Sequence, residues 1–346
     1  MISGRRRGPG AILLRGGLRL LSAPYGWATA LRNRLYDWGW KRSERAAVPV
    51  VSVGNLTVGG TGKTPCVEYI ARFYRETGLL VAILSRGYGA EHGPNDEALV
   101  LEENLPDVPH LQGADRVGLA RAAVEELESE VLVLDDAFQH RRLMRDLDVV
   151  LVDATNPWGH GHLLPRGLLR ESPRGLRRAG VVVLTRCDQV SEQERAELRE
   201  QVRRLSPHAA VVETRHGPVE LVNSEQETAG LDGLRARPVA AFCGIGNPEA
   251  FRRTLTDRGA QVSDFRTYPD HHPYSRGDVE ELRRWAEGQP ADALLVTTQK
   301  DLVKLGLTSL AGRPLWALRV RLQGLTDEGL APLDDRLRQI TAPLAA

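Results

Sequence analysis

Short apolar runs alternate with longer segments of helical periodicity along most of the chain. The segments 64–77 and 115–128, among others, carry apolar residues at helical spacing. This alternation predicts an α/β fold in which helices cover both faces of a parallel sheet. Five apolar runs are predicted to be its buried strands: VPVVSVGN (48–55), LLVAILSRG (79–87), EVLVLDDA (130–137), DVVLVDA (148–154) and GVVVLTRCD (180–188).

A second α/β pattern occupies the later part of the chain. Residues 237–255 are predicted to form a strand, a glycine turn and a helix, and 291–305 a strand followed by a loop or helix start. Because 346 residues exceed what one core usually serves, we expect two domains. The expected divisions are an amphipathic region (1–42), a first α/β domain (43–207), an extended connector (208–222), a smaller α/β domain (223–312), and a return strand with the C-terminal segment (313–346).

The first forty residues combine apolar and cationic side chains. Trp27, Leu31, Leu35 and Trp38 fall at helical spacing. Residues 1–42 hold nine Lys or Arg and one acid, a net charge of +8, so the rest of the chain carries −7. This favours an amphipathic helix lying on an anionic membrane surface, and a helix packed on the protein's own core is the alternative.

Length and composition limit the remaining classes of protein. The uncharged run in residues 20–31 is shorter than the ~20 residues that a crossing helix needs. Cys66, Cys187 and Cys243 lie far apart, which indicates neither a disulfide framework nor a zinc site and suits a reducing compartment. The negative charge of the remaining chain argues against nucleic-acid binding.

A glycine-rich turn follows the first predicted strand. Successive glycines let backbone N–H groups converge on phosphate oxygens, and the helix N-terminus that follows favours negative charge. Lys63 would neutralise the β- and γ-phosphates, and the Thr64 hydroxyl would reach Mg²⁺. The turn therefore predicts a P-loop NTPase-like domain that binds ATP and Mg²⁺ through Gly59, Gly60, Thr61, Gly62, Lys63 and Thr64.

The turn departs from two familiar loop patterns. Thr57 stands where G-x-x-x-x-G-K-[ST] has its first glycine. Val58 stands where the related loop of membrane-associated ATPases has a lysine. Asp135 and Asp136 end the strand VLVL beside this loop, where carboxylates are placed to hold Mg²⁺ directly or through water.

An ordered set of motifs resembles the tetraacyldisaccharide 4′-kinase family, the lipid A kinases. The resemblance covers nearly the whole chain and includes the amphipathic start. It implies ATP-dependent phosphorylation of the 4′-hydroxyl of a tetra-acylated glucosamine disaccharide 1-phosphate, at the cytoplasmic face of the inner membrane. The motifs are LLVAILSRGYG (79–89), NDEAL (95–99), LDDAFQHRRL (134–143), LLPRGLLRE (163–171), YPDHHPYS (268–275) and TTQKDLVK (297–304).

The resemblance also implies roles for individual residues. Asp96 matches the catalytic base, His271 the histidine that pairs with it, and Glu97 an acid that helps to hold the metal. Lys63 matches a catalytic and phosphate-binding residue, and Thr64, Asp135 and Asp136 match metal ligands. Five residues match positions near the lipid headgroup or in the adjoining turn: Tyr88, Arg116, Gln139, His140 and Arg170.

These roles lead to an expectation about assembly. Asp96 and His271 are expected to come from different domains, so that domain closure would assemble the site. The Asp96–Glu97 pair is expected in a polar loop, and Lys300–Asp301 either faces the cleft or forms a surface ion pair. The interpretation requires a lipid disaccharide substrate and an anionic membrane surface, with no nucleic acid and no protein partner.

Two rival functions share the same nucleotide site. A membrane-associated ATPase switch would control a protein partner, although Val58 replaces its loop lysine. An ATP-dependent ligase or small-molecule kinase would use the same core without a membrane, which the tryptophan-rich basic start disfavours.

Overall fold

The computed structural model describes residues 8–87, 96–235 and 237–342, and these divide into two compact units. The first unit comprises Met1–Gly87, Asp107–His216 and Leu322–Ala346, and the second comprises Tyr88–Pro106 and Gly217–Arg321. Residues 88–106, which the sequence analysis assigned to the first domain, therefore group with the second unit. Each unit has its own buried apolar clusters.

The first unit is built on a parallel sheet whose strands pair in the order β7–β6–β5–β1–β4–β2–β3. Every residue of β1, β2, β4 and β6 is buried and most are apolar, as expected for strands buried on both faces. The strands are β1 (Val50–Asn55), β2 (Val81–Ser85), β3 (His110–Gln112), β4 (Val131–Leu134), β5 (Leu147–Asp153), β6 (Val181–Thr185) and β7 (Ala210–Val222).

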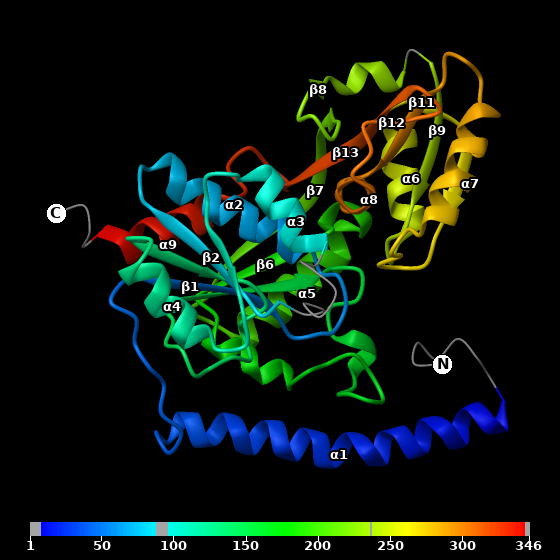
Figure 1. The fold of residues 1–346 in the computed structure, drawn as a ribbon. Coiled ribbons are helices and arrows are strands. Elements are labelled where there is room, and N and C mark those ends of the chain that lie inside the picture. The colour runs from blue at the N-terminus through cyan, green and yellow to red at the C-terminus, as the bar shows by residue number, and fades with distance from the viewer. Residues whose placement is uncertain (1–7, 88–95, 236, 343–346) are drawn as a thin grey trace. The chain divides into compact units, whose positions relative to one another are not determined.

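Helices cover the sheet of this unit. In Figure 1, α1 lies below the sheet, and α2 and α9 lie above it. Tyr69 of α2 donates a hydrogen bond to Asp334 of α9 at 2.7 Å, which ties the two helices together. The helices are α1 (Pro9–Asp37), α2 (Lys63–Glu76), α4 (Arg116–Glu125), α5 (Glu192–Leu205) and α9 (Ala331–Thr341).

The second unit has a smaller sheet in the order β10–β9–β11–β13, all parallel. Strands β12 and β8 add short antiparallel pairs to β13 and to the end of β7. Its strands are β8 (Thr228–Ala229), β9 (Pro238–Cys243), β10 (Gln261–Thr267), β11 (Leu294–Thr298), β12 (Ser309–Leu310) and β13 (Arg313–Gly324). Its helices are α3 (Asp96–Asn104), α6 (Pro248–Asp257), α7 (Arg276–Glu287) and α8 (Gln299–Leu305).

The α/β fold class and the N-terminal helix are confirmed. The predicted connector, 208–222, contains the long strand β7, which begins in the first unit and ends in the second. Among the elements that were not predicted are β3, β10 and α3. Strand β3 has three half-buried residues, β10 has a mostly polar sequence, and α3 begins at a pair of acids that suggested a loop.

Candidate active site

The glycine-rich loop joins β1 to α2, and side chains hold its backbone at two successive residues. The Asn55 amide donates to the Thr61 hydroxyl at 2.9 Å, and the Thr185 hydroxyl donates to the Thr61 carbonyl at 3.0 Å. The Arg186 guanidinium donates to the Gly60 carbonyl at 2.7 Å. These hydrogen bonds therefore fix the conformation of the loop.

The loop has a crowded side and an open side. Gly62 has φ 86°, and a Cβ there would lie 2.2 Å from the ring of His216, so only glycine fits. Beside Gly59 and Gly60, no described heavy atom lies within 4 Å of the position that a Cβ would take. Helix α2 begins at Lys63, and its first N–H groups have no partner within the helix. The open side therefore suits an anion such as a phosphate.

An acidic turn follows β4 in the same unit. Lys63 Nζ lies 3.6 Å from Asp136 Oδ1, and Arg170 Nη1 lies 2.8 Å from the same oxygen. Arg116 is buried and donates to the carbonyls of Asp135 and Asp136, at 2.6 and 3.3 Å. These contacts bring the predicted phosphate-binding lysine together with the predicted metal-binding acids.

The charge of Asp136 follows from its neighbours. Burial alone would raise the pKa of this carboxyl, but Lys63, Arg170 and Arg116 hold it below its usual value. Asp136 is therefore ionised at neutral pH. A carboxylate beside a phosphate loop, with the buried Thr64 at the start of α2, fits the hard oxygen ligands that Mg²⁺ prefers.

Two more residues predicted near the lipid headgroup adjoin this turn. The Gln139 amide donates to the Asn55 carbonyl at 2.9 Å and to Glu171 at 3.0 Å, and Arg170 donates to the Gln139 oxygen at 3.4 Å. Burial and nearby arginines lower the pKa of His140 to about 4, so its imidazole is neutral at pH 7. The structure thus places Arg116, Gln139, His140 and Arg170 around one turn.

Helix α1 contacts the segments that carry these residues. Tyr25 donates to the Arg170 carbonyl at 2.9 Å, and Arg32 donates to the Gln139 carbonyl at 3.0 Å. Asn33 donates to Glu171 at 2.8 Å. The helix is therefore attached to the unit by polar contacts, and none of its described residues is buried.

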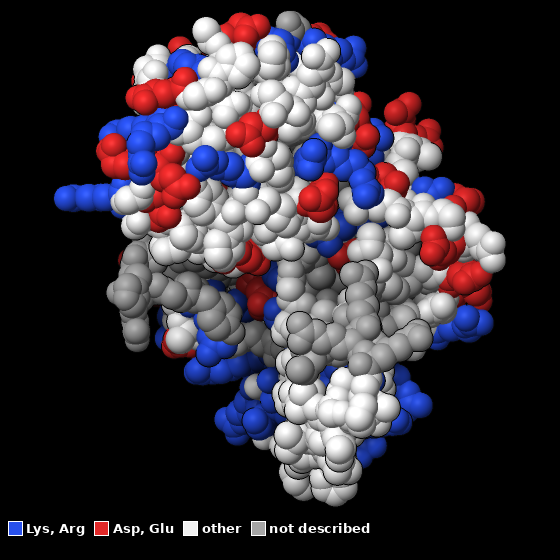
Figure 2. All heavy atoms as spheres, turned by 90° about the vertical axis from the view of Figure 1, so that its right-hand side faces the viewer, with Lys and Arg blue, Asp and Glu red and all other residues white. Residues whose placement is uncertain are grey.

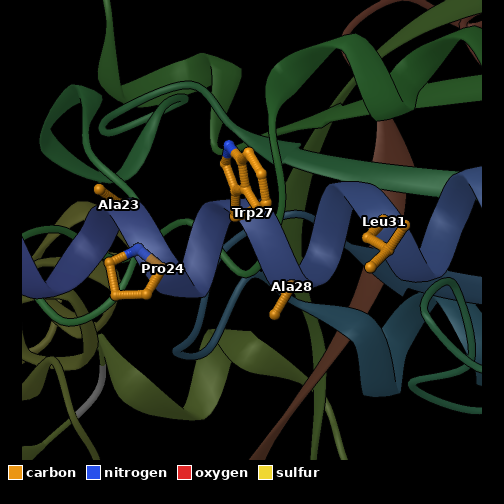
Figure 3. A pocket seen from close by; sticks show the side chains of 5 residues that line it. All are labelled: Ala23, Pro24, Trp27, Ala28 and Leu31. Atoms are coloured by element: carbon orange, nitrogen blue, oxygen red, sulfur yellow. The ribbon is translucent and has the colours of Figure 1, made fainter.

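The other side of α1 is apolar and exposed. An open pocket along it is lined by Ala23, Pro24, Trp27, Ala28 and Leu31 (Figure 3). At the level of α1, the lower part of Figure 2, uncharged atoms are flanked by Lys and Arg. No helix among the described residues is long and apolar enough to cross a membrane. The exposed large apolar side chains of residues 8–40 are Ile12, Leu13, Leu14, Leu20, Leu21, Trp27, Leu31, Trp38 and Trp40.

A second group of candidate residues lies within the second unit. His271 Nδ1 is 3.0 Å from Asp96 Oδ2 and 3.1 Å from Oδ1. Lys304 Nζ lies 3.1 Å from Asp96 Oδ2, and Lys300 Nζ lies 2.7 Å from Glu97 Oε1. Helices α3 and α8 pack together and supply the acids and the lysines. His271 comes from the loop between β10 and α7.

The Asp96 carboxyl is ionised despite being buried. Burial alone would raise its pKa, but Lys300, Lys304 and His271 lower it below the usual value. Because an ionised carboxylate only accepts hydrogen bonds, His271 Nδ1 carries the hydrogen that lies between them. The Asp96 side chain is 5% exposed and that of His271 is 58% exposed.

The second unit differs from two expectations. Asp96 and Glu97 form the first turn of α3 rather than a polar loop, because α8 packs against them and supplies cations. Asp96 and His271 belong to the same unit, so their contact forms without domain closure. Tyr88 lies outside the described residues.

The predicted metal ligands are divided between the units. Thr64, Asp135 and Asp136 belong to the first unit, and Glu97, paired with Lys300, belongs to the second. Among the described residues, no three His, Cys, Asp or Glu side chains form a metal cluster. Mg²⁺ keeps several waters and commonly binds one or two carboxylates together with substrate phosphates, so the residues near the loop fit it without such a cluster.

Two residues at these sites were not singled out from the sequence. Lys304 contacts Asp96, and its position four residues after Lys300 on a predicted helix start was the available signal. His216 packs against Gly62 from the predicted connector, and no local pattern marks it. Arg186 also belongs to this site, because its guanidinium donates to the Gly60 carbonyl of the loop.

Comparisons with known proteins agree over nearly the whole chain. The family model described as LpxK, tetraacyldisaccharide-1-P 4′-kinase, matches residues 14–338. A tetraacyldisaccharide 4′-kinase of Anaeromyxobacter dehalogenans is 45% identical, over 91% of this chain and 88% of the relative. The tetraacyldisaccharide 4′-kinase of Syntrophus aciditrophicus is 37% identical, over 92% of this chain and 90% of the relative.

A solved structure supports the same relationship. LpxK from Aquifex aeolicus, crystallised with ATP, is 31% identical and superposes with a TM-score of 0.76, covering 94% of this chain and 99% of that one. The family model, the relatives and the solved structure each match this chain across both units. The chain belongs to the tetraacyldisaccharide 4′-kinase family.

Proposed function

We infer that this protein transfers the γ-phosphoryl group of ATP to the 4′-hydroxyl of a tetra-acylated glucosamine disaccharide 1-phosphate. The main support for the proposal is the glycine-rich loop, where Lys63 lies 3.6 Å from the ionised Asp136. The chain that carries this loop belongs to the kinase family described above. Phosphoryl transfer depends mainly on alignment and charge neutralisation. The loop would align the phosphates, Lys63 would neutralise part of their charge, and Asp136 would help to hold Mg²⁺.

The first unit would hold the nucleotide and the sugar headgroup. Backbone N–H groups of the loop and Lys63 would bind the β- and γ-phosphates. Bound Mg²⁺ would neutralise charge on those phosphates, and Thr64, Asp135 and Asp136 are the nearby groups that fit it. The sugar headgroup of the lipid would be contacted by Arg116, Gln139, His140 and Arg170.

The second unit would supply the base. A sugar hydroxyl is a poor nucleophile unless a base takes its proton as attack proceeds. Asp96 is ionised, and His271 donates to it, so we assign proton acceptance to Asp96 with His271 as its partner. The greater exposure of His271 favours a second assignment, in which its Nε2 takes the proton and Asp96 orients the ring. Glu97 would assist the metal.

Helix α1 would bring the enzyme to its substrate. Its exposed apolar side chains and flanking arginines suit the interface of an anionic membrane. The same helix bonds to the segments that carry Arg170 and Gln139, so membrane contact and headgroup binding are coupled through α1. We propose that the protein acts at the cytoplasmic face of the inner membrane and requires no protein partner.

Product analysis tests the function directly. The protein is incubated with ATP labelled in its γ-phosphate, Mg²⁺ and the tetra-acyl disaccharide 1-phosphate in mixed micelles. We expect label on the 4′-position and none on a control lipid that already carries a 4′-phosphate. ATP hydrolysis without labelled lipid, rising when a protein partner is added, would instead favour the ATPase switch.

A further inference from the structure

Helix α8 presents two lysines to the acids that begin α3. Lys300 and Lys304 are four residues apart and therefore lie on one face of the helix. Lys300 Nζ reaches Glu97 Oε1 at 2.7 Å, and Lys304 Nζ reaches Asp96 Oδ2 at 3.1 Å. Each of two consecutive acids thus has its own lysine from the same helix.

The contact between Lys304 and Asp96 differs from an ordinary surface ion pair. The Lys304 side chain is 14% exposed and that of Asp96 is 5% exposed. Exposed pairs contribute little because water competes for both charges. Here little water reaches either group, so the loss of the lysine would leave a buried carboxylate without one of its cations.

The start of α8 is fixed by contacts that do not involve its two lysines. The Gln299 amide donates to the Asn104 oxygen at 3.0 Å, which links the start of α8 to the end of α3. The Asp301 carboxylate is fully buried and accepts from the Thr298 hydroxyl at 2.6 Å. These contacts hold Lys304 in a defined place relative to α3.

The same aspartate fixes the loop that carries His271. Asp301 accepts from the Gly244 backbone N–H at 3.1 Å and from the Tyr274 hydroxyl at 2.9 Å. The backbone N–H of His271 in turn donates to the Gly244 carbonyl at 3.2 Å. Helix α8 therefore positions both members of the Asp96–His271 pair, one through Lys304 and the other through Asp301.

We propose that Lys304 is a positioning residue for phosphoryl transfer, which fixes the Asp96 carboxylate in its orientation against His271. The proposal rests on the proposed function, in which Asp96 and His271 handle the proton of the acceptor hydroxyl. Lys304 Nζ lies 3.1 Å from Oδ2, and this contact would restrict rotation of the carboxylate about its last bond. Lys304 itself takes no part in proton transfer.

The test compares Lys304→Met with Lys304→Arg in the full-length enzyme. The methionine variant keeps the length of the side chain and removes its charge. Because small misplacement of a reacting group can cost about 10²-fold, we expect kcat to fall by roughly 10- to 100-fold. The KM for ATP stays within about twofold, since the phosphate loop belongs to the first unit. The arginine variant recovers most of kcat.

A matched control and a double variant complete the design. Arg283→Met removes an exposed ion pair with Glu280 in the same unit and leaves kcat unchanged. If Lys304 acts through Asp96, adding Lys304→Met to Asp96→Asn lowers kcat little further. A near-normal kcat for Lys304→Met, equal losses in the methionine and arginine variants, or additive losses in the double variant would overturn the proposal.

The outcome also separates this inference from the proposed function. A large loss in Asp96→Asn with normal turnover in Lys304→Met rejects the positioning role and leaves the function in place. Normal turnover in Asp96→Asn removes Asp96 from the chemistry, and the positioning role is then rejected with it. Thermal unfolding of each variant shows whether a loss of kcat reflects lost structure.

Discussion

His271 Nδ1 lies 3.0 Å from the Asp96 carboxylate, and both residues belong to one folded unit. Replacement Asp96→Asn keeps the shape of the side chain and removes the carboxylate that we propose as the proton acceptor. General-base help is commonly worth ~10²–10⁴-fold, so we expect kcat to fall by that factor. The affinity for ATP should not change, because Asp96 lies outside the unit that holds the phosphate loop. Equilibrium nucleotide binding and steady-state turnover measure the two effects, and near-normal turnover would exclude Asp96 as base.

The pH profile distinguishes the two proton acceptors. Lysines hold the pKa of Asp96 below its usual value of about 3.9. A base with a lowered pKa stays deprotonated as pH falls. From about pH 8 down to about pH 5, protonation of Asp96 should therefore cause no decrease in kcat/KM. An acid limb within that range would instead favour His271 Nε2 as the proton acceptor. The profile is measured with the lipid held below its KM.

The phosphate loop offers a test of packing. Gly62→Ala combines a left-handed backbone with a Cβ that would lie 2.2 Å from the His216 ring. Backbone strain of this kind costs about 1–3 kcal/mol, which corresponds to roughly 5- to 150-fold in ATP affinity if the loop must shift. Gly78→Ala is the matched control, because Gly78 has the same φ of 86° and no described atom within 4 Å of its Cβ position.

Isothermal titration with ATP and thermal unfolding separate the two effects. Gly78→Ala should lower the melting temperature and leave ATP affinity unchanged. Equal ATP affinity in Gly62→Ala and the wild-type protein would show that the contact with His216 does not shape the loop.

Two neutral histidines predict how stability depends on pH. Burial and neighbouring arginines together lower the pKa of His216 and of His140 to about 4. In the unfolded chain each titrates near 6.5, so the unfolded state binds more protons between pH 6.5 and 4. Stability is therefore complete above about pH 6.5 and falls as pH drops toward 4.

Urea unfolding across this range measures the dependence on pH. His216→Gln should show a smaller loss of unfolding free energy between pH 6.5 and 4 than the parent protein does. His208→Gln, at an exposed position of the same unit, is the control and should keep the original slope. An unchanged slope in His216→Gln would mean that His216 is not buried as a neutral group.

The sequence was sufficient for the features that depend on local patterns. Continuous apolar runs predicted β1, β4, β5 and β6, and the glycine-rich loop predicted the turn that joins β1 to α2. The ordered motifs gave the family. Each of these signals is contained in a short stretch of chain, so no tertiary information was required.

Contacts between distant segments could not be derived in the same way. Asp96 and Lys304 are 208 positions apart in sequence, and only the packing of α3 on α8 makes them neighbours. The grouping of residues 88–106 with the second unit has the same origin. Strand β10 escaped notice because its polar residues, such as Asp264, satisfy their hydrogen bonds through Trp285 and Gln289.

The exposed side of α1 gives a final prediction about membranes. Trp27 and Leu31 lie one turn apart on the open apolar pocket (Figure 3) and are 81% and 50% exposed. Full burial of a large apolar side chain contributes about 1.5–3 kcal/mol. The double replacement Trp27→Ser and Leu31→Ser should therefore weaken partition onto anionic vesicles by roughly tenfold or more.

Sedimentation with vesicles of defined composition measures this partition. Leu127→Ser, which removes an exposed leucine remote in sequence from α1, is the control and should bind vesicles normally. Because the flanking arginines contribute electrostatic attraction, binding of the parent protein should also weaken as salt is raised or anionic lipid is withdrawn. Vesicle binding that is unchanged in the double variant would mean that this face of α1 is not the membrane contact, and the alternative of α1 as a purely structural helix would then hold.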